Sequence, residues 1–374
     1  MVYLDYAANS PVDKDVLDLY YDTTLKYIAN PNSSHKLGLE AKNLLDESTC
    51  KIAKLLNVKN EEIIYTSGSS ESNNLAIFGI AKRYKNKGKH IIVSALEHSS
   101  VISPVTALLD DGYEVDVLKV NHNGEVDLEE LKSIIRNDTI LVSINYVDSE
   151  LGIIQQIEKI SNIIKGYPNC IFHTDATQAV GKINVDASLV DLMTISPHKF
   201  YGLNGFGILI KKENIVLNPI VLGGKSTTIY RSGAPVLNMI VSTAKALEIA
   251  LNNMNDRYNY VKELNEYLKV NLNKYKSVKF NSGDNCLPYI LNISIKGIKS
   301  TTYVEMLEKH NVYVSVKAAC CPINTMSKSV YALTNDKKVA SSTLRISFSH
   351  LTTKNELNEF LNIFDICYKE LIKE

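Results

Sequence analysis

The first clear pattern in the chain is an amphipathic one between residues 36 and 56. Ala41, Leu45 and Ile52 recur at helical spacing, so we predict a helix there. Downstream, short apolar runs of strand length alternate with helical stretches at 72–85 and 128–136. We predict strands at 62–66, 90–94, 114–118, 140–145, 170–174, 192–196 and 207–210. This alternation indicates an α/β fold, with a mainly parallel sheet covered by helices on both faces.

The pattern changes at 218–235, where the chain is rich in Gly, Ser and Thr and predicts a long loop before a helix at 241–253. The remainder reads as a smaller α+β unit. We predict strands at 287–295, 312–316 and 343–349, and helices at 301–310 and from 354. A chain of 374 residues exceeds the roughly 250–300 residues of one core. We therefore predict a large domain at 13–250 and a small domain formed by 1–12 and 251–374.

Charge and composition exclude several classes of function. The chain has 41 basic and 41 acidic residues, which argues against strong nucleic-acid binding. It contains no apolar run of the ~18 residues that a membrane span needs and begins with no signal-peptide pattern, so we expect a cytoplasmic protein with no direct membrane contact. The six cysteines form no CxxC pair, and we predict neither a disulfide framework nor a metal site.

Lys199 follows the strand predicted at 192–196, in the run SPHKFYG. A lysine at a strand end is usually only solvated. Here Ser196 and His198 flank it and can donate to a phosphate, while a deprotonated lysine amine can bond a carbonyl carbon.

Asp175 ends the strand predicted at 170–174, and Gln178 follows shortly after it. A buried carboxylate needs a partner, and a pyridinium nitrogen is a suitable one. The alternative is that Asp175 is a helix N-cap.

Two further strand ends carry weaker signals. The run SGSSESNN places small residues at a predicted helix start, where backbone N–H groups can bind an anion. His98, in LEHSS, follows another strand and could stack on a ring and move protons, although a lone histidine is more often structural. Because the four strand ends belong to one sheet, together they predict that pyridoxal phosphate (PLP) is bound as a Schiff base on Lys199.

At these residues the sequence resembles the cysteine desulfurases of the class V aminotransferase group. The likeness covers nearly the whole chain, through LDYAANSPV, NPNSSHKLG, TSGSSESNN, LEHSSV, HTDATQAVGK, SPHKFYG and LRISFS. It implies PLP fold type I with a seven-stranded sheet, PLP as cofactor, and a homodimer with active sites near the subunit interface.

The resemblance also implies a role for each matching residue. Asp175 pairs with the pyridine nitrogen, Gln178 bonds the ring hydroxyl, and His98 stacks on the ring and works as acid and base. Arg345 binds the substrate carboxylate, a task that suits a guanidinium fork, and Cys320 accepts the sulfur. Further contacts are expected from Ser69, Ser70, Ser149, Ser196 and His198 to the cofactor and from Asn30 to the substrate.

The implied reaction converts L-cysteine to L-alanine and leaves a persulfide on Cys320 for a sulfur-acceptor protein, in iron–sulfur cluster assembly or tRNA thiolation. The alternatives are a selenocysteine or cystine lyase, an aminotransferase, or a non-catalytic scaffold for sulfur transfer. The chain departs from the family in three places. Asp148 and Ser149 replace two asparagines, Lys225 to Thr227 and Ala234 alter a phosphate-binding loop, and Cys321 follows Cys320 directly.

Overall fold

The centre of the fold is a seven-stranded sheet in the computed structural model, which describes residues 1–317 and 325–372. Its strand order is β2 (Ile63–Thr66), β8 (Gly207–Lys211), β7 (Leu192–Ile195), β6 (Ile171–Asp175), β5 (Thr139–Ser143), β3 (His90–Ser94) and β4 (Glu114–Leu118). Strand β8 is antiparallel to both of its neighbours, and the other strand pairs are parallel. The prediction of an α/β fold with a mainly parallel seven-stranded sheet is confirmed.

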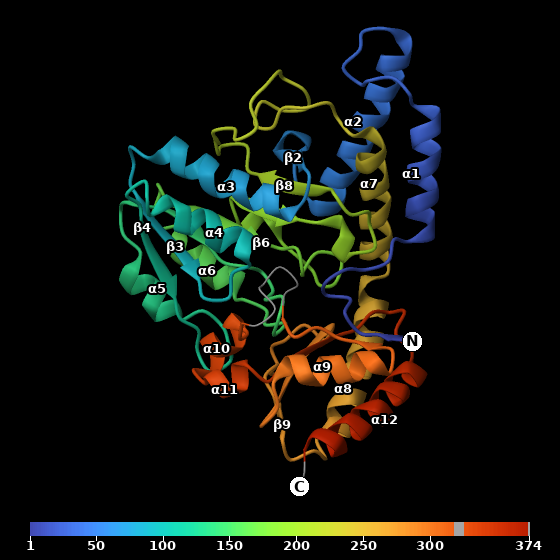
Figure 1. Ribbon diagram of the computed structural model, residues 1–374. Helices are drawn as coiled ribbons and strands as arrows, with labels where there is room; N and C mark the ends of the chain where they lie inside the picture. Colours follow the sequence, from blue (N-terminus) through green and yellow to red (C-terminus); the bar gives the residue numbers. More distant parts are fainter. Residues whose placement is uncertain (318–324, 373–374) are drawn as a thin grey trace.

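Helices cover both faces of this sheet (Figure 1). They are α1 (Lys14–Lys26), α2 (Lys36–Leu56), α3 (Ser69–Tyr84), α4 (Ser99–Leu108), α5 (Leu128–Ile134), α6 (Ile157–Ile164) and α7 (Leu237–Asn252). Helices α3 and α4 share a core with Ile64 and Ile91, whereas α2, α6 and α7 share another with Ile63 and Ile92. Successive side chains of a strand point to opposite faces, which explains why adjacent isoleucines enter different cores.

A second sheet of three antiparallel strands lies beside the first, in the order β12 (Thr343–Ser347), β10 (Ile290–Ile295) and β9 (Val278–Phe280). Its unit contains α8 (Met254–Leu272), α9 (Ser300–Lys309), α10 (Lys328–Thr334), α11 (Lys337–Ala340) and α12 (Lys354–Leu371). Near the N-terminus, β1 (Val2–Tyr3) pairs with β11 (Val312–Tyr313). This pairing supports the assignment of 1–12 to the small domain, although the division into domains stays a prediction.

Two helices differ from the expected pattern. Helix α3 begins at Ser69 instead of residue 72, so the run SGSSESNN itself forms the first turn. Helix α4 was not predicted, because Pro104 interrupts its pattern. Over residues 1–317 and 325–372, no helix is both long and apolar enough to cross a bilayer. The cytoplasmic location stays a prediction.

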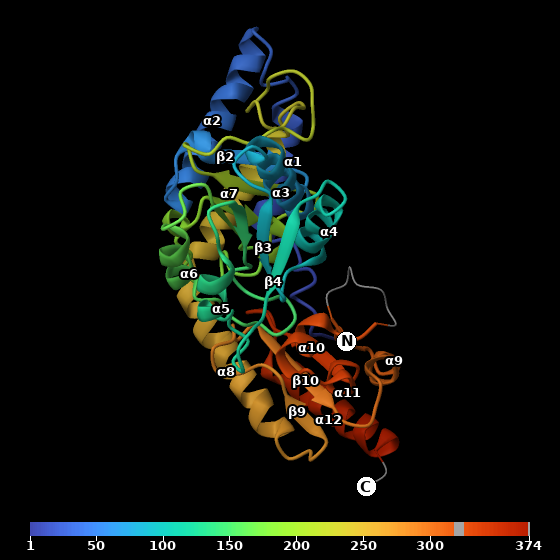
Figure 2. The same ribbon diagram turned by 90° about the vertical axis from the view of Figure 1, so that its left-hand side faces the viewer.

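Figure 2 shows the two units one above the other, with α3 and α4 on one side of the large sheet and α5 and α6 on the other. The parallel strands β3, β5, β6 and β7 place their carboxyl ends at one edge. Ligands of such sheets bind at that edge.

Candidate active site

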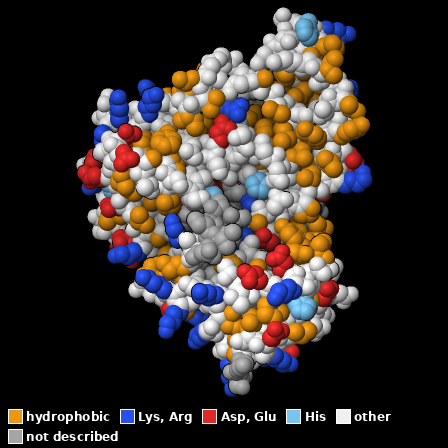
Figure 3. Space-filling view, in the orientation of Figure 1, with side chains coloured by type: hydrophobic (Ala, Val, Ile, Leu, Met, Phe, Trp, Pro, Cys, Tyr) orange, Lys and Arg blue, Asp and Glu red, His pale blue; other side chains and the backbone are white. Residues whose placement is uncertain are grey.

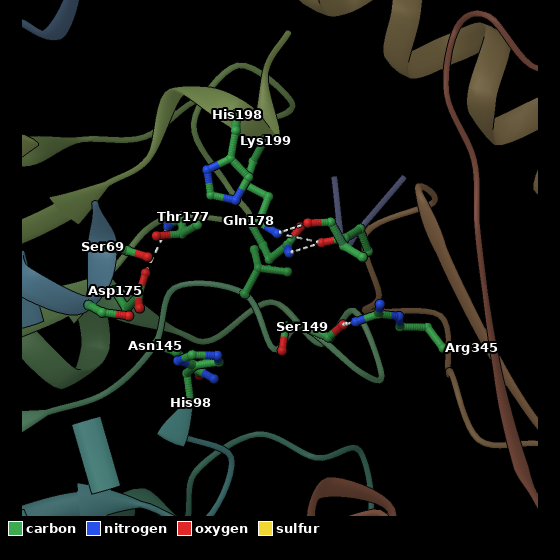
Figure 4. Close-up of a pocket in the computed structure, with 14 residues that line it drawn as sticks. Ser69, His98, Asn145, Ser149, Asp175, Thr177, Gln178, His198, Lys199 and Arg345 are labelled. Atoms are coloured by element: carbon green, nitrogen blue, oxygen red, sulfur yellow. Dashed lines mark hydrogen bonds between the residues drawn. The ribbon is translucent and has the colours of Figure 1, made fainter. Parts of the chain in front are cut away.

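A cavity of about 260 Å³ lies at the carboxyl ends of the parallel strands (Figure 4). Nine of the predicted site residues line it: Ser69, Ser70, His98, Ser149, Asp175, Gln178, His198, Lys199 and Arg345. Figure 3 shows the hollow between the upper and lower parts of the molecule. The structure thus gathers side chains that lie far apart in the sequence.

Two predicted residues do not line the cavity, and a third is not described by the structure. Ser196 is fully buried behind the cavity, and its Oγ lies 2.8 Å from Nδ1 of His198. Asn30 is exposed and is not among the residues that line the cavity; its Oδ1 accepts a hydrogen bond from the backbone N–H of Asn32. Cys320 lies outside the described residues.

Lys199 ends a short 3-10 turn, Pro197–Lys199, directly after β7. Its Nζ donates to the backbone carbonyls of Ala7 and Ala8, at 2.9 and 2.5 Å. The N-terminal segment therefore forms one wall of the cavity, in line with the LDYAANSPV motif. Backbone acceptors carry no side-chain signal, which is why sequence reasoning missed these contacts.

Asp175 is the last residue of β6 and is 8% exposed. Its Oδ2 accepts a hydrogen bond from Asn73 Nδ2 at 2.8 Å, and its Oδ1 accepts one from the backbone N–H of Thr177 at 3.0 Å. These bonds make the buried carboxylate tolerable while it still faces the cavity. The bond from Thr177 is of the kind an N-cap makes, but no helix begins directly after β6, since the next one, a 3-10 helix, begins at Ala187.

The part of the cavity at the start of α3 suits an anion. Helix α3 begins at Ser69 with no side-chain cap on its first turn, so its backbone N–H groups and positive dipole point outward. His198 also lines this cavity, and burial, followed by the charges of Lys199 and Lys182, lowers its pKa to about 4. His198 is therefore a neutral hydrogen-bonding group near neutral pH.

His98 is the N-cap of α4, and its Nδ1 accepts a hydrogen bond from the backbone N–H of Ser100 at 3.1 Å. Asn145 lies beside it at the end of β5 (Figure 4). The Asn145 Nδ2 donates to Leu96 O at 2.7 Å, whereas its buried Oδ1 has no hydrogen-bond partner among the described residues. Asn145 was not predicted as a site residue, although its place after an apolar strand was a signal.

Arg345, on β12, enters the cavity from the small unit (Figure 4). Its Nη2 donates to Asp5 Oδ1 at 2.9 Å and its Nη1 to Ser149 O at 3.0 Å. Its buried Nε finds no partner in residues 1–317 or 325–372. The guanidinium is thus held in place with donor capacity remaining.

A buried lysine, Lys182, contacts Gln178. Lys182 Nζ donates to Gln178 Oε1 at 2.8 Å, and Gln178 Nε2 donates to Ala7 O at 2.9 Å. Burial, followed by the charges of Lys199 and Arg345, lowers the pKa of Lys182 to about 7. Because Lys182 engages the amide oxygen, the amide nitrogen of Gln178 is the end turned toward the cavity wall.

These residues fit PLP. The cavity offers a lysine amine, a buried carboxylate for the ring nitrogen, and an anion-binding helix end. In addition, Asn145 Oδ1 and Thr177 Oγ1 are buried polar atoms on its lining that lack partners within the described part of the chain. A bound polar molecule would satisfy such atoms.

Comparison with known proteins agrees with this site. Residues 2–360 match the aminotransferase class-V family. The chain belongs to this family. A NifS/IcsS protein homolog from Lactobacillus delbrueckii is 37% identical and covers 100% of this chain and 98% of its own length. Cysteine desulfurase IscS from Dictyoglomus turgidum is 36% identical, with 99% and 95% covered.

Solved structures give the same result for this member of the class-V family. A NifS-like protein superposes with a TM-score of 0.91 at 30% identity, covering 98% of each chain. SspA in complex with cysteine superposes with a TM-score of 0.83 at 31% identity, covering 94% of this chain and 100% of SspA. The predictions of PLP fold type I, of PLP as cofactor and of a cysteine desulfurase are confirmed.

One departure from the class-V pattern has a structural explanation. Asp148 is buried, accepts hydrogen bonds from the backbone N–H groups of Glu150 and Leu151, and accepts one from Ser329 Oγ at 3.0 Å. Burial, followed by the charge of Glu150, raises its pKa to about 7. Asp148 therefore holds the loop whose next residue, Ser149, contacts Arg345.

Proposed function

We propose that this enzyme removes the sulfur of L-cysteine, releases L-alanine, and carries the sulfur on Cys320 to an acceptor protein. The observation that best supports the proposal is the meeting of Lys199, Asp175 and Arg345 at one cavity. A lysine and a carboxylate suit PLP, and an arginine suits the carboxylate of an amino acid.

The cofactor contacts follow from the lining. Lys199 would hold PLP covalently, Asp175 would hold the ring nitrogen in its protonated form, and Gln178 would donate to the ring hydroxyl. The first turn of α3 with Ser69 and Ser70, together with His198, would bind the phosphate, and Ser196 would orient His198 through the contact of its Oγ with Nδ1. Once bound, PLP withdraws electrons from the α-carbon of the amino acid.

Arg345 would orient the substrate. The guanidinium is already aligned by Asp5 and by the backbone carbonyl of Ser149. The carboxylate of the substrate would accept hydrogen bonds from the remaining N–H groups of Arg345. The substrate would then lie on the same side of the cavity as the N-terminal segment. The Lys199 amine would move protons, with the carbonyls of Ala7 and Ala8 as acceptors for its ammonium form.

Cys320 would take the sulfur. Its thiolate attacks the sulfur of the substrate, an S–S bond forms, and the Cβ–S bond breaks; the β-carbon then gains a proton, so that cysteine becomes alanine and Cys320 becomes a persulfide. Ser315 and Arg345 exchange two backbone hydrogen bonds. Ser315, which precedes Cys320 by five residues in the sequence, therefore lies beside the arginine that would bind the substrate.

The test is product analysis. Protein reconstituted with PLP and given L-cysteine and a thiol should yield alanine and sulfide in equal amounts, and Lys199→Ala should yield neither. Lys82→Ala, which removes an exposed lysine of α3, is the matched control and should keep full activity. Formation of a keto acid instead of alanine would favour an aminotransferase, and turnover of selenocysteine alone would favour a selenocysteine lyase.

A further inference from the structure

A buried hydrogen-bond chain connects Asp175 to His98 through two residues that the reaction scheme above does not use. Asn73, on α3, donates through Nδ2 to Asp175 Oδ2 and to Ser100 Oγ, both at 2.8 Å. Ser100 Oγ lies 2.8 Å from Nδ1 of His98. Asn73 is fully buried and Ser100 is 9% exposed, so water does not compete strongly for these bonds.

The direction of each bond follows from the donors and acceptors present. Asp175 Oδ2 accepts its bond from the amide, which fixes the Asn73 amide with its nitrogen toward both partners. Since Asn73 donates to Ser100 Oγ, the hydroxyl hydrogen of Ser100 is left for His98.

Nδ1 of His98 is therefore an acceptor. It faces the Ser100 hydroxyl at 2.8 Å and the Ser100 backbone N–H at 3.1 Å. The backbone donor cannot rotate away, because it belongs to the first turn of α4. A neutral imidazole with an accepting Nδ1 carries its hydrogen on Nε2.

We propose that Asn73 and Ser100 are positioning residues that hold His98 as the Nε2–H tautomer. His98 then offers a hydrogen-bond donor to the bound amino acid, and the α-proton passes to the amine of Lys199. A base at Nε2 would need the ring hydrogen on Nδ1, where the Ser100 N–H already points. The roles of His98 as donor and Lys199 as base rest on the proposed function, whereas the tautomer of His98 does not.

The tautomer is measurable by long-range ¹H–¹⁵N NMR on cofactor-free protein labelled with ¹⁵N-histidine, with His98→Gln to assign the signals. We expect an unprotonated Nδ1 and a protonated Nε2 at about pH 8, where an ordinary histidine is neutral. Ser100→Ala and Asn73→Ala should each add a fraction of the Nδ1–H tautomer, because only the backbone N–H of residue 100 then remains as a fixed donor that holds Nδ1 as an acceptor. Ser100→Thr keeps the hydroxyl and should leave the signals as in the unaltered protein.

Thr106→Ala is the matched control, because Thr106 lies on the same helix and its hydroxyl donates to Ile102 O; it should leave the His98 signals unchanged. Thermal unfolding of each variant checks that the fold is retained. A protonated Nδ1 in the unaltered protein would overturn the proposal, and so would unchanged His98 signals in a folded Asn73→Ala variant. Because no turnover is measured, a failure of the desulfurase assay would leave this result interpretable.

Discussion

Each charged group of the cavity is matched to a neutral or oppositely charged partner before any ligand binds. Asp175 has Asn73 and a backbone N–H, and Arg345 has Asp5 and a backbone carbonyl. Such partners offset the cost of removing a charge from water. They also fix the direction in which the charge acts, which is the property that catalysis needs.

Asp175→Asn tests the role of that charge. The amide has nearly the same shape but cannot hold a proton on the ring nitrogen by charge, so we expect the turnover rate to fall by about 100-fold or more. Steady-state kinetics with cysteine measure this. Asp186→Asn, at a helix N-cap outside the cavity, should keep the rate of the unaltered enzyme. Near-normal turnover by Asp175→Asn would move the role to another residue.

Arg345→Lys tests substrate anchoring. Lysine keeps the charge but loses the planar fork, so we expect the KM for cysteine to rise about 10- to 100-fold. The amount of bound PLP, read from its absorbance, should stay the same. Arg136→Lys alters an exposed arginine that pairs with Glu114 and Asp138, and it serves as the control. An equal loss of PLP would show that Arg345 acts mainly on the fold.

At the scale of elements, the phosphate end depends on the close approach of β8 to the turn before α3. A Cβ on Gly207, the first residue of β8, would lie 2.5 Å from the carbonyl carbon of Gly68 and 2.7 Å from its Cα. Only glycine allows this approach without moving the backbone. The position of the helix end that receives the phosphate is therefore set by a strand that is distant in sequence.

Gly207→Ala should lower the free energy of unfolding by about 1–3 kcal/mol, because the added methyl group must push the Gly68 turn aside. It should also weaken PLP binding. Urea unfolding and a PLP titration measure the two effects. Gly224→Ala is the control, since its Cβ would meet nothing within 4 Å. Unchanged PLP affinity in Gly207→Ala would show that the Gly68 turn does not position the phosphate site.

The elements that could be predicted from the sequence are those whose local pattern of apolar residues already shows that they are buried. All seven strands of the large sheet are found at the predicted places, because both faces of the inner strands are covered and their residues are almost uniformly apolar. The run after β7 likewise predicted Lys199 at a strand end. By contrast, β11 is only Val312–Tyr313 instead of 312–316, because its pairing ends where β1 ends.

The contacts that could not be predicted join residues far apart in sequence. Lys199 donates to the carbonyls of Ala7 and Ala8, which lie 192 and 191 residues away in the sequence. Arg345 donates to Asp5, which lies 340 residues away. Nothing in the local pattern of either partner specifies the other. The role of Asn73 was missed for the same reason: its partners, Ser100 and Asp175, belong to other elements.

At the scale of the whole molecule, large apolar side chains are exposed on one part of the surface. Leu17, Tyr21 and Leu25 lie on α1, and Leu222 and Ile229 lie on the loop before α7. Figure 3 shows orange side chains gathered at the upper right, where α1 and α7 lie. Exposed apolar groups in one region are typical of protein interfaces. They support the predicted homodimer.

Sedimentation equilibrium should give about twice the chain mass of 41.7 kDa. A Leu222→Asp, Ile229→Asp double variant should shift the protein toward monomer, since two charges would be buried in an apolar contact. Val270→Asp places the same charge on an equally exposed valine of α8 and should leave the dimer intact. A monomeric unaltered protein would contradict the prediction.

The central claim is that the sulfur of cysteine passes through this active site to Cys320. The most direct measurement is mass spectrometry of peptides from the holoenzyme after incubation with L-cysteine and no acceptor. We predict one additional sulfur atom on Cys320, its retention in Cys321→Ala, and its loss in Cys320→Ala with the PLP absorbance unchanged. Sulfur found only on Cys321, or on neither cysteine while alanine is still formed, would contradict the account.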